Sequence, residues 1–282
     1  MPYNISVEGK YMDRIEIMNR VREHHEEAKS LGYNVVATIL QGSQNYGLEI
    51  DCEEYHSDVD TKCIVIPTFD DFCSNKGRIS TTYVRANNEH IDLKDVGTLF
   101  ELFRKANVNI LEILFSKYYT VEPDYKDWFE KLRSYGERIC SANKCQTFRT
   151  MSGLSMEKYK ALKHPYPSII DKIEKYGYDG KQLHHILRIA NFIGRYYRGE
   201  RFKDCLKVHK NSRENMDKAK LNWFSLGTAE SLAKMWDDFT KEIKDKYCEE
   251  HKNDPIDEKM YEILNKMKIE AYKMAFRKEL SL

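Results

Sequence analysis

Apolar and polar positions change their spacing twice along the chain. Residues 11–31 carry apolar side chains at the spacing of an amphipathic helix, which Gly32 ends. Strand-like apolar runs and polar turns follow from Val35 to Leu93, and from Thr98 onward nearly every segment has helical periodicity. This pattern predicts an α+β fold: a domain with a mixed sheet flanked by helices over residues 1–118, then an all-helical domain over residues 119–282. The apolar stripe of the first helix is expected at Ile15, Ile17, Met18, Val21, His25 and Ala28.

Two apolar runs frame a short polar turn. Val35–Leu40 is β-prone throughout, as in a strand that is buried on both faces, and Gly42 and Ser43 end it abruptly. A helix is expected to begin near Gln44, and residues 59–66 form a second strand-like run that Pro67 closes. The order is therefore strand, turn, helix and strand.

The turn has the chemistry of a phosphate site. Gly42 lets backbone N–H groups approach a ligand without an intervening Cβ, and Ser43 adds a hydroxyl donor. A helix that starts near Gln44 would also direct the positive end of its dipole at the anion. We therefore expect Gly42 and Ser43 to bind a nucleotide.

Two carboxylates open the second strand. Asp58 and Asp60 are two residues apart, so both side chains point to the same face. Adjacent carboxylates repel each other and raise each other's pKa unless a cation lies between them. Mg²⁺ is commonly held by one or two such carboxylates together with phosphate oxygens of a substrate.

A strand, a Gly-Ser turn, a helix and an Asp-x-Asp strand together resemble the nucleotidyltransferases of the DNA polymerase β superfamily. The resemblance implies a polymerase β-like catalytic domain in which a third carboxylate completes a site for two Mg²⁺ ions, with Mn²⁺ as an alternative. It implies transfer of a nucleoside monophosphate from a nucleoside triphosphate such as ATP to an acceptor hydroxyl, with release of pyrophosphate. Asp58 and Asp60 would bind the ion on the triphosphate, and all three carboxylates would bind the second ion.

The third carboxylate is expected on a later strand. Residues 79–84 and 90–93 are predicted as two short strands around the turn pair Asn87-Asn88. Asp92 lies in the second of these strands and is the first choice for the third metal ligand and for the group that accepts the proton of the acceptor hydroxyl. Asp95 is the alternative, although it is also placed to cap the helix that follows it.

A second group of polar residues lies on a predicted helix far along the chain. Lys181, His185 and Arg188 fall at i, i+4 and i+7 and share one stripe, while apolar residues form the other face. The segment Tyr-Asp-x-Lys-x-x-x-His-x-x-Arg resembles a motif of the uncharacterised bacterial and phage branch of the superfamily. The resemblance implies that these three residues bind the nucleotide and that the helical domain closes the nucleotide cleft.

A third segment, residues 107–115, fits the same branch with the pattern Asn-x-Asn-x-x-Glu-x-Leu-Phe. Asn109 and Glu112 either orient the substrate or only cap and anchor their helix, and the sequence leaves both interpretations open. The resemblance covers residues 33–200.

Composition narrows the class of protein. The chain has 282 residues, 41% of them apolar, and a formal net charge of +1, so each domain can build a core and no global basic field indicates nucleic acid. No apolar run is long enough to span a bilayer, and residues 1–4 lack the basic start of a signal peptide. The seven cysteines lack metal-ligand spacing and indicate reduced thiols in a cytoplasmic protein.

The acceptor is the open question. Residues 195–220 mix basic, aromatic and acidic side chains, which fits either an RNA track or an ordinary charged surface. An RNA end, a protein side chain and a small molecule all remain candidate acceptors. The alternative function is a nucleotide-sensing module that keeps the fold without turnover, but such a module would have little need for Ser43, Asp58, Asp60 and a third carboxylate.

Overall fold

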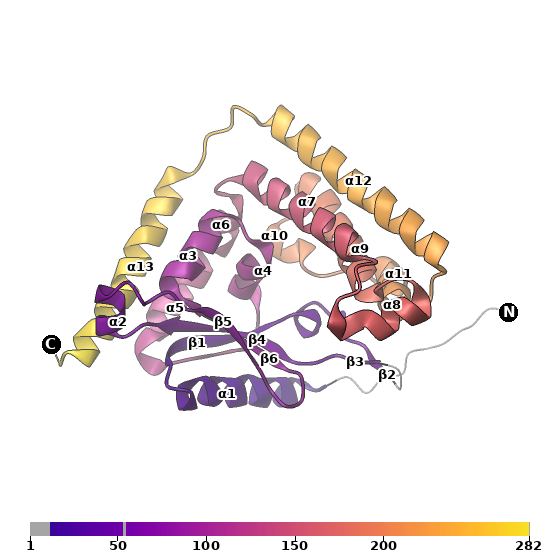
Figure 1. The fold of residues 1–282 in the computed structure, drawn as a ribbon. Helices are drawn as coiled ribbons and strands as arrows, with labels where there is room; N and C mark the ends of the chain where they lie inside the picture. Colours follow the sequence, from indigo (N-terminus) through magenta and orange to yellow (C-terminus); the bar gives the residue numbers. More distant parts are fainter. Residues whose placement is uncertain (1–11, 53–54, 282) are drawn as a thin grey trace. The chain divides into compact units, whose positions relative to one another are not determined.

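The computed structural model describes residues 12–52 and 55–281, and its backbone groups into two compact units (Figure 1). The first unit takes the described residues of Met1–Asn45, His56–Ala142 and Ile256–Leu282, and the second takes those of Tyr46–Tyr55 and Asn143–Pro255. Residue 11, where the first helix was expected to begin, lies outside the described residues. The assignment of a catalytic role to residues 1–118 and of a cleft-closing role to residues 119–282 stays a prediction.

A five-stranded mixed sheet forms the centre of the first unit, in the order β5-β6-β4-β1-β7. The strands β4 and β6 are parallel, and every other neighbouring pair is antiparallel. This arrangement confirms the predicted mixed sheet. The strands are β1 (Asn34–Gln41), β4 (Asp60–Ile66), β5 (Ser80–Val84), β6 (His90–Asp95) and β7 (Tyr119–Val121).

Helix α1 (Arg14–Ser30) covers one face of this sheet (Figure 1). Asp13 caps its N-terminus by accepting the backbone N–H of Glu16 at 2.8 Å. Ala28 packs against residues of β1, β4 and β6, and Ile17 and Val21 pack at the other end of the same face. The expected apolar stripe was wrong at one position, because Ile15 is 72% exposed.

Two buried histidines attach α1 to the sheet by hydrogen bonds. The Nδ1 atom of His24 lies 2.9 Å from Thr61 Oγ1 on β4, and that of His25 lies 3.1 Å from Thr38 Oγ1 on β1. The Nε2 atom of His24 lies 3.0 Å from Glu89, a residue whose side chain is 4% exposed. Buried polar groups that are fully paired in this way fix one register between a helix and a sheet.

The remaining helices of the first unit lie between its strands or follow the last strand in sequence, and the last helix, α13, comes after the whole second unit. Helix α13 packs against α3 and α5, and the indole N–H of Trp128 donates to the carbonyl of Met267 at 2.9 Å. Its Phe276 also meets Phe69 and Phe72 of α2. These elements are η1 (Ser43–Asn45), α2 (Phe69–Cys73), α3 (Val96–Arg104), α4 (Val108–Leu111), η2 (Glu112–Phe115), η3 (Pro123–Tyr125), α5 (Lys126–Ser134), α6 (Gly136–Ser141) and α13 (Glu258–Glu279).

The second unit is helical, and α9 packs against α7, α11 and α12. Its aromatic core includes Phe148, which stacks on Tyr196 and on Tyr247. A two-stranded sheet joins β2 to β3. The elements are β2 (Asp51–Cys52), α7 (Lys144–Ala161), η4 (Pro167–Ile169), α8 (Ile170–Tyr176), α9 (Gly180–Tyr197), α10 (Phe202–Cys205), α11 (Lys210–Lys220) and α12 (Leu226–Glu250), and β3 (Tyr55–His56) begins in this unit at Tyr55.

A disulfide corrects the prediction that all cysteines are reduced thiols. Cys145 at the start of α7 is bonded to Cys248 near the end of α12. The two cysteines are 103 residues apart in sequence, and only the packing of α7 beside α12 brings them together. Residue spacing alone could not have shown this pairing.

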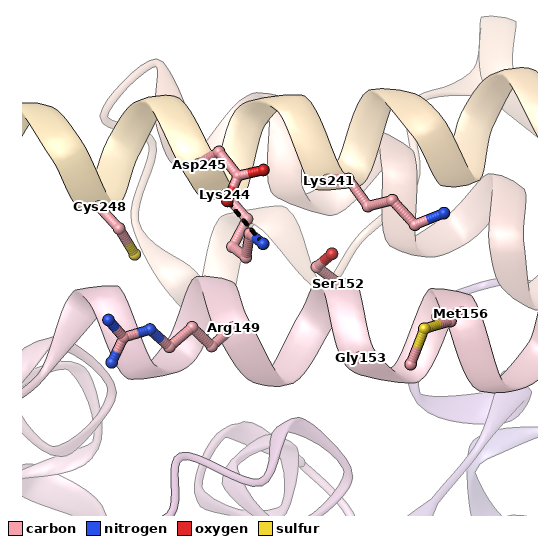
Figure 2. A pocket seen from close by; sticks show the side chains of 8 residues that line it. All are labelled: Arg149, Ser152, Gly153, Met156, Lys241, Lys244, Asp245 and Cys248. Atoms are coloured by element: carbon pink, nitrogen blue, oxygen red, sulfur yellow. Dashed lines mark ion pairs between the residues drawn. The ribbon is translucent and has the colours of Figure 1, made fainter.

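A pocket of about 480 Å³ lies next to the disulfide, between α7 and α12. Figure 2 shows Arg149 and Met156 on one helix facing Lys241 and Lys244 on the other, with Lys244 ion-paired to Asp245. None of the residues expected to bind metal or nucleotide lines this pocket.

Among the helices of residues 12–52 and 55–281, none combines the length and the hydropathy needed to cross a lipid bilayer.

Glu89 should make the stability of the fold depend strongly on pH in the acidic range. Burial acts to raise the pKa of Glu89, but its hydrogen bonds with His24 and Asn87 and the charges of Arg20 and His24 outweigh this effect and lower that pKa to about 2. A carboxyl whose pKa is lower in the folded state stabilises the fold above its unfolded pKa. We expect Glu89→Gln to lower the free energy of unfolding at pH 7 by about 3 kcal/mol, and the difference from wild type to shrink as the pH falls from about 4.5 to about 2.

Urea unfolding followed by circular dichroism across this pH range measures the effect. Glu101→Gln is the matched control, because its ion pair with Arg78 is exposed and should contribute less than about 1 kcal/mol. An equal loss in both variants would contradict the role given to Glu89.

Candidate metal centre

The pairing of β1 with β4 places the Gly-Ser turn beside the Asp-x-Asp segment. Gln41 pairs with Asp60, and Gly42 and Ser43 follow Gln41 directly. Gly42 has a φ of +85°, a conformation that strains residues with a side chain, and no heavy atom lies within 4 Å of where its Cβ would be. The turn is only partly buried, so a ligand can reach it from solvent.

The helix expected after the turn is wrong in length. Residues 43–45 form a single 3₁₀ turn, η1, which ends at Asn45. Asn45 is held by its side-chain N–H, which donates to the carbonyl of Leu40 at 2.7 Å, and by the hydroxyl of Ser116, which donates to its side-chain oxygen at 2.8 Å. An anion at this turn would therefore be bound by the turn's own N–H and hydroxyl groups, without the dipole of a long helix.

Three side chains converge at the start of β4 and β6. One ligand atom each from Asp58, Asp60 and His90 lie within 4.8 Å of one another. The backbone N–H of His90 and its Nδ1 atom both lie 2.9 Å from Asp60 Oδ1. Burial and the negative charge of Asp58 raise the pKa of Asp60, and the hydrogen bonds from His90 only partly offset this rise.

These donors fit one divalent cation. Two carboxylates are the ligands that Mg²⁺ and Mn²⁺ prefer, and an imidazole nitrogen shifts the preference toward transition-metal ions such as Mn²⁺. A cation would also relieve the repulsion between Asp58 and Asp60. The pair of carboxylates was predicted from sequence, and the histidine was not.

His90 reaches the site through the register of two parallel strands. Thr61 on β4 pairs with Ile91 on β6, so the preceding residues, Asp60 and His90, lie side by side on the opposite face. In the sequence His90 is only the first residue of a predicted strand. The parallel pairing joins segments 30 residues apart, and no local pattern reveals its register.

Asp92 lies on the same face of the sheet as Asp60. It is two residues beyond His90 along β6. It pairs with Lys62 in the register, and its carboxylate accepts from Lys62 Nζ at 2.7 Å and from Lys94 Nζ at 2.6 Å. Burial acts to raise the pKa of Asp92, but these two ammonium groups outweigh it and lower that pKa. Burial lowers the pKa of Lys62, and Asp92 opposes this effect. The role of Asp92 as a third metal ligand stays a prediction.

Asp95 has the structural role that was expected as its alternative. It is buried and caps α3, where its Oδ1 accepts the backbone N–H of Thr98 at 2.9 Å and its Oδ2 accepts the hydroxyl of Thr98 at 2.6 Å. It also alternates to the face opposite Asp92. Of the two candidates, only Asp92 shares a face with Asp60.

Half of the second motif has a structural explanation in the second unit. Tyr178 is fully buried and its hydroxyl donates to the carbonyl of Phe224 at 3.0 Å, while Asp179 caps α9 by accepting the backbone N–H of Lys181. A Cβ on Gly180 would lie 2.1 Å from the carbonyl oxygen of Ala219, so only glycine allows α9 to approach α11 here.

The polar stripe of α9 contains one exposed and two partly buried residues. Lys181 is exposed, and the guanidinium of Arg188 lies 3.8 Å from the centre of the Tyr46 ring, within cation–π range. Burial, followed by the charges of its neighbours, lowers the pKa of His185 well below its ordinary value. His185 is therefore neutral at pH 7, and a role in binding a phosphate would be as a hydrogen-bond donor. Nucleotide binding by these residues stays a prediction.

The two residues of the third segment differ in burial. Asn109 is exposed and Glu112 is 5% exposed, on consecutive short helices of the first unit. The two interpretations of this pair, substrate orientation and helix anchoring, both stay open.

Residues 13–193 match the family model described as RlaP, RNA repair pathway DNA polymerase beta family. The chain belongs to this family. The match spans the sheet, the Gly-Ser turn, the Asp58-Asp60-His90 cluster and most of α9, so the resemblance to the DNA polymerase β superfamily is confirmed. Membership in the RlaP family also confirms the predicted fold class.

A solved structure with a related description also matches. It is a nucleotidyltransferase-like protein from Exiguobacterium sibiricum 255-15, with 11% sequence identity, coverage of 82% of this chain and 75% of that chain, and a TM-score of 0.31. No relative was found among the curated proteins.

The donor set leads to a prediction about metal binding. We expect the protein to bind Mn²⁺ more tightly than Mg²⁺, and Asp60→Asn to weaken Mn²⁺ binding by at least about tenfold, because an amide keeps the shape of the ligand but loses its charge. Isothermal titration calorimetry with each ion measures both effects. Asp70→Asn, which removes an exposed acid on α2, is the control and should bind Mn²⁺ as wild type does. Equal Mn²⁺ affinity in the two variants would place the metal elsewhere.

Proposed function

We propose that this chain is a metal-dependent nucleotidyltransferase that moves a nucleoside monophosphate from a nucleoside triphosphate to an acceptor hydroxyl. The observation that carries the proposal is the convergence of Asp58, Asp60 and His90 beside the open turn at Gly42 and Ser43. Membership in the RlaP family supports the same reaction class.

The chain's own groups divide the work. Asp58 and Asp60 would hold a divalent ion, and His90 would bind that ion or orient Asp60 through the hydrogen bond it already makes. When bound, such an ion stabilises the charge that develops on the phosphate oxygens during displacement at the α-phosphorus. Backbone N–H groups of the turn and the hydroxyl of Ser43 would bind the phosphates.

An RNA end is the acceptor that we favour, because the family is described as an RNA repair pathway family. The basic segment 195–220 supports this choice less than its sequence indicated. Arg195 is 5% exposed and its guanidinium is used inside the unit, where it donates to the carbonyls of Lys207 and Asp204 and pairs with Glu200. A nucleotide-sensing module is the competing function.

Transfer of label tests the enzyme against the sensor. The protein is incubated with each α-labelled nucleoside triphosphate, Mg²⁺ or Mn²⁺, and an RNA oligonucleotide with a free 3′ hydroxyl, and the products are separated on a denaturing gel. We expect labelled RNA, and a loss of at least about a hundredfold in Asp58→Ala and in Asp60→Ala, because each removes an ion ligand.

Asp70→Ala serves as the control with full activity. Label on protein or on a small product would keep the transferase and change the acceptor. Nucleotide binding without label on any acceptor would favour the sensing module. Unchanged transfer in Asp58→Ala and in Asp60→Ala would show that the proposed site is not the catalytic one.

Arg188 allows a separate test of nucleotide binding by α9. If its guanidinium contacts the triphosphate, Arg188→Ala should raise the KM for the nucleoside triphosphate at least about tenfold with a smaller change in kcat. Arg198→Ala, just beyond the end of the same helix, is the control. Steady-state kinetics at saturating acceptor separates the two constants, and an unchanged KM would argue against a role of Arg188 in binding the nucleotide.

A further inference from the structure

We propose that Lys62, together with Lys94, supplies as a built-in cation the positive charge that a second metal ion supplies in a two-metal site, so that this chain works with one divalent ion. The inference rests on the proposed function and concerns the number of ions. It differs from the expectation that the family resemblance gives, which is two ions held by three carboxylates.

The strand register separates Asp92 from the cluster that would hold an ion. Asp60 lies beside His90, and Lys62 lies beside Asp92, as consecutive pairs on one face of the parallel strands. The ligand atoms of Asp58, Asp60 and His90 lie within 4.8 Å of one another, and among the described residues Asp92 is not part of this cluster. The residue of β6 directly beside Asp60 is His90, whose side chain is an imidazole.

Asp92 is also committed to ammonium groups. Lys62 Nζ lies 2.7 Å from one carboxylate oxygen and Lys94 Nζ lies 2.6 Å from the other, so both oxygens are in close ion pairs. The side chains of Lys62 and Asp92 are 8% and 14% exposed. A second ion would have to displace a buried lysine from its partner and leave an uncompensated charge in a low-dielectric place.

The charges balance with a single ion. Three carboxylates, two ammonium groups and one divalent ion leave one net positive charge, the same charge that three carboxylates and two divalent ions leave. Lys62 lies on β4 two residues after Asp60, so its charge stands next to the ion site as well as beside Asp92. Lys62 and Lys94 together thus carry the charge of a second divalent ion, and Lys62 is the one that lies beside the ion site.

Electron paramagnetic resonance of bound Mn²⁺ counts the ions without turnover. Two Mn²⁺ ions about 4 Å apart are exchange-coupled, whereas a lone Mn²⁺ gives a six-line spectrum. The full chain is mixed with a non-hydrolysable nucleoside triphosphate analogue and excess Mn²⁺, and free Mn²⁺ is subtracted. We expect the spectrum of a lone ion in wild type and in Lys62→Arg, which keeps the charge.

Lys62→Met is the decisive variant, and Lys94→Met is its matched control. Removal of Lys62 frees Asp92 Oδ2 from its ion pair, so a second ion can bind and we expect an exchange-coupled spectrum. Lys94 lies one pair further from Asp60 and its loss should leave a lone ion. A coupled spectrum in wild type, or a lone ion in a folded Lys62→Met, would overturn the proposal.

The two proposals fail in different ways. Absence of label transfer in wild type would end the transferase, yet the spectrum would still report how many ions bind. Label transfer together with a coupled wild-type spectrum would keep the transferase and end the role of Lys62. If Lys62→Met does not fold, the wild-type spectrum decides alone.

Discussion

The parallel pairing of β4 with β6 is the constraint on which the candidate site depends. Its register places His90 beside Asp60 and Lys62 beside Asp92, and a slip by one residue would turn all four side chains to the other face of the sheet. Because the two strands are separated in sequence by α2 and β5, only tertiary packing can hold this register. The arrangement of the site residues on one face of the sheet therefore depends on the contacts that hold the strands in register from the other face.

The opposite face supplies that anchor. Thr61 and Glu89 are each one position away from a site residue, so their side chains point to the opposite face of the sheet. Both side chains contact the same histidine of α1. Thr61 lies between Asp60 and Lys62, and Glu89 directly precedes His90. The buried His24 thus ties β4 to the start of β6 at the level of the metal cluster. Such a fully paired buried network specifies a unique arrangement as well as adding stability.

The sequence was informative wherever the signal is local. Apolar runs predicted the strands β1 and β4, turn residues predicted the Gly-Ser turn, and capping chemistry predicted the role of Asp95. Asp58 precedes β4, so its approach to Asp60 is shown by the cluster geometry and not by alternation along a strand. Sequence patterns failed where the structure depends on contacts between residues that are far apart in the chain. His90 became a ligand candidate through a parallel register, and Cys145 met Cys248 through helix packing.

Length and burial were harder to predict than the type of element. The helix expected at Gln44 is a single turn that ends at Asn45. The side-chain N–H of Asn45 donates to the carbonyl of Leu40, and the chain leaves the helical conformation after this residue. The last long helix, α13, belongs to the first unit although it follows the whole second unit in sequence, and its helical period gave no sign of this partner. In the Tyr178–Gly180 motif, the signal that resembled a ligand site belongs in large part to packing and capping.

The electrostatics of the cluster favour a bound cation over a purely structural role. The fold holds Asp58 close to a partly buried Asp60 and raises the pKa of the latter, which means that the ionised pair is less stable here than in water. A structural carboxylate is expected to be neutralised by the protein itself, as Lys62 and Lys94 neutralise Asp92 two residues beyond His90. The same sheet face thus holds one carboxylate that the chain satisfies and a pair that it leaves partly unsatisfied. A site that a cation enters and leaves would require a partly unsatisfied pair such as Asp58 and Asp60. The lysines that neutralise Asp92 would keep further cations away.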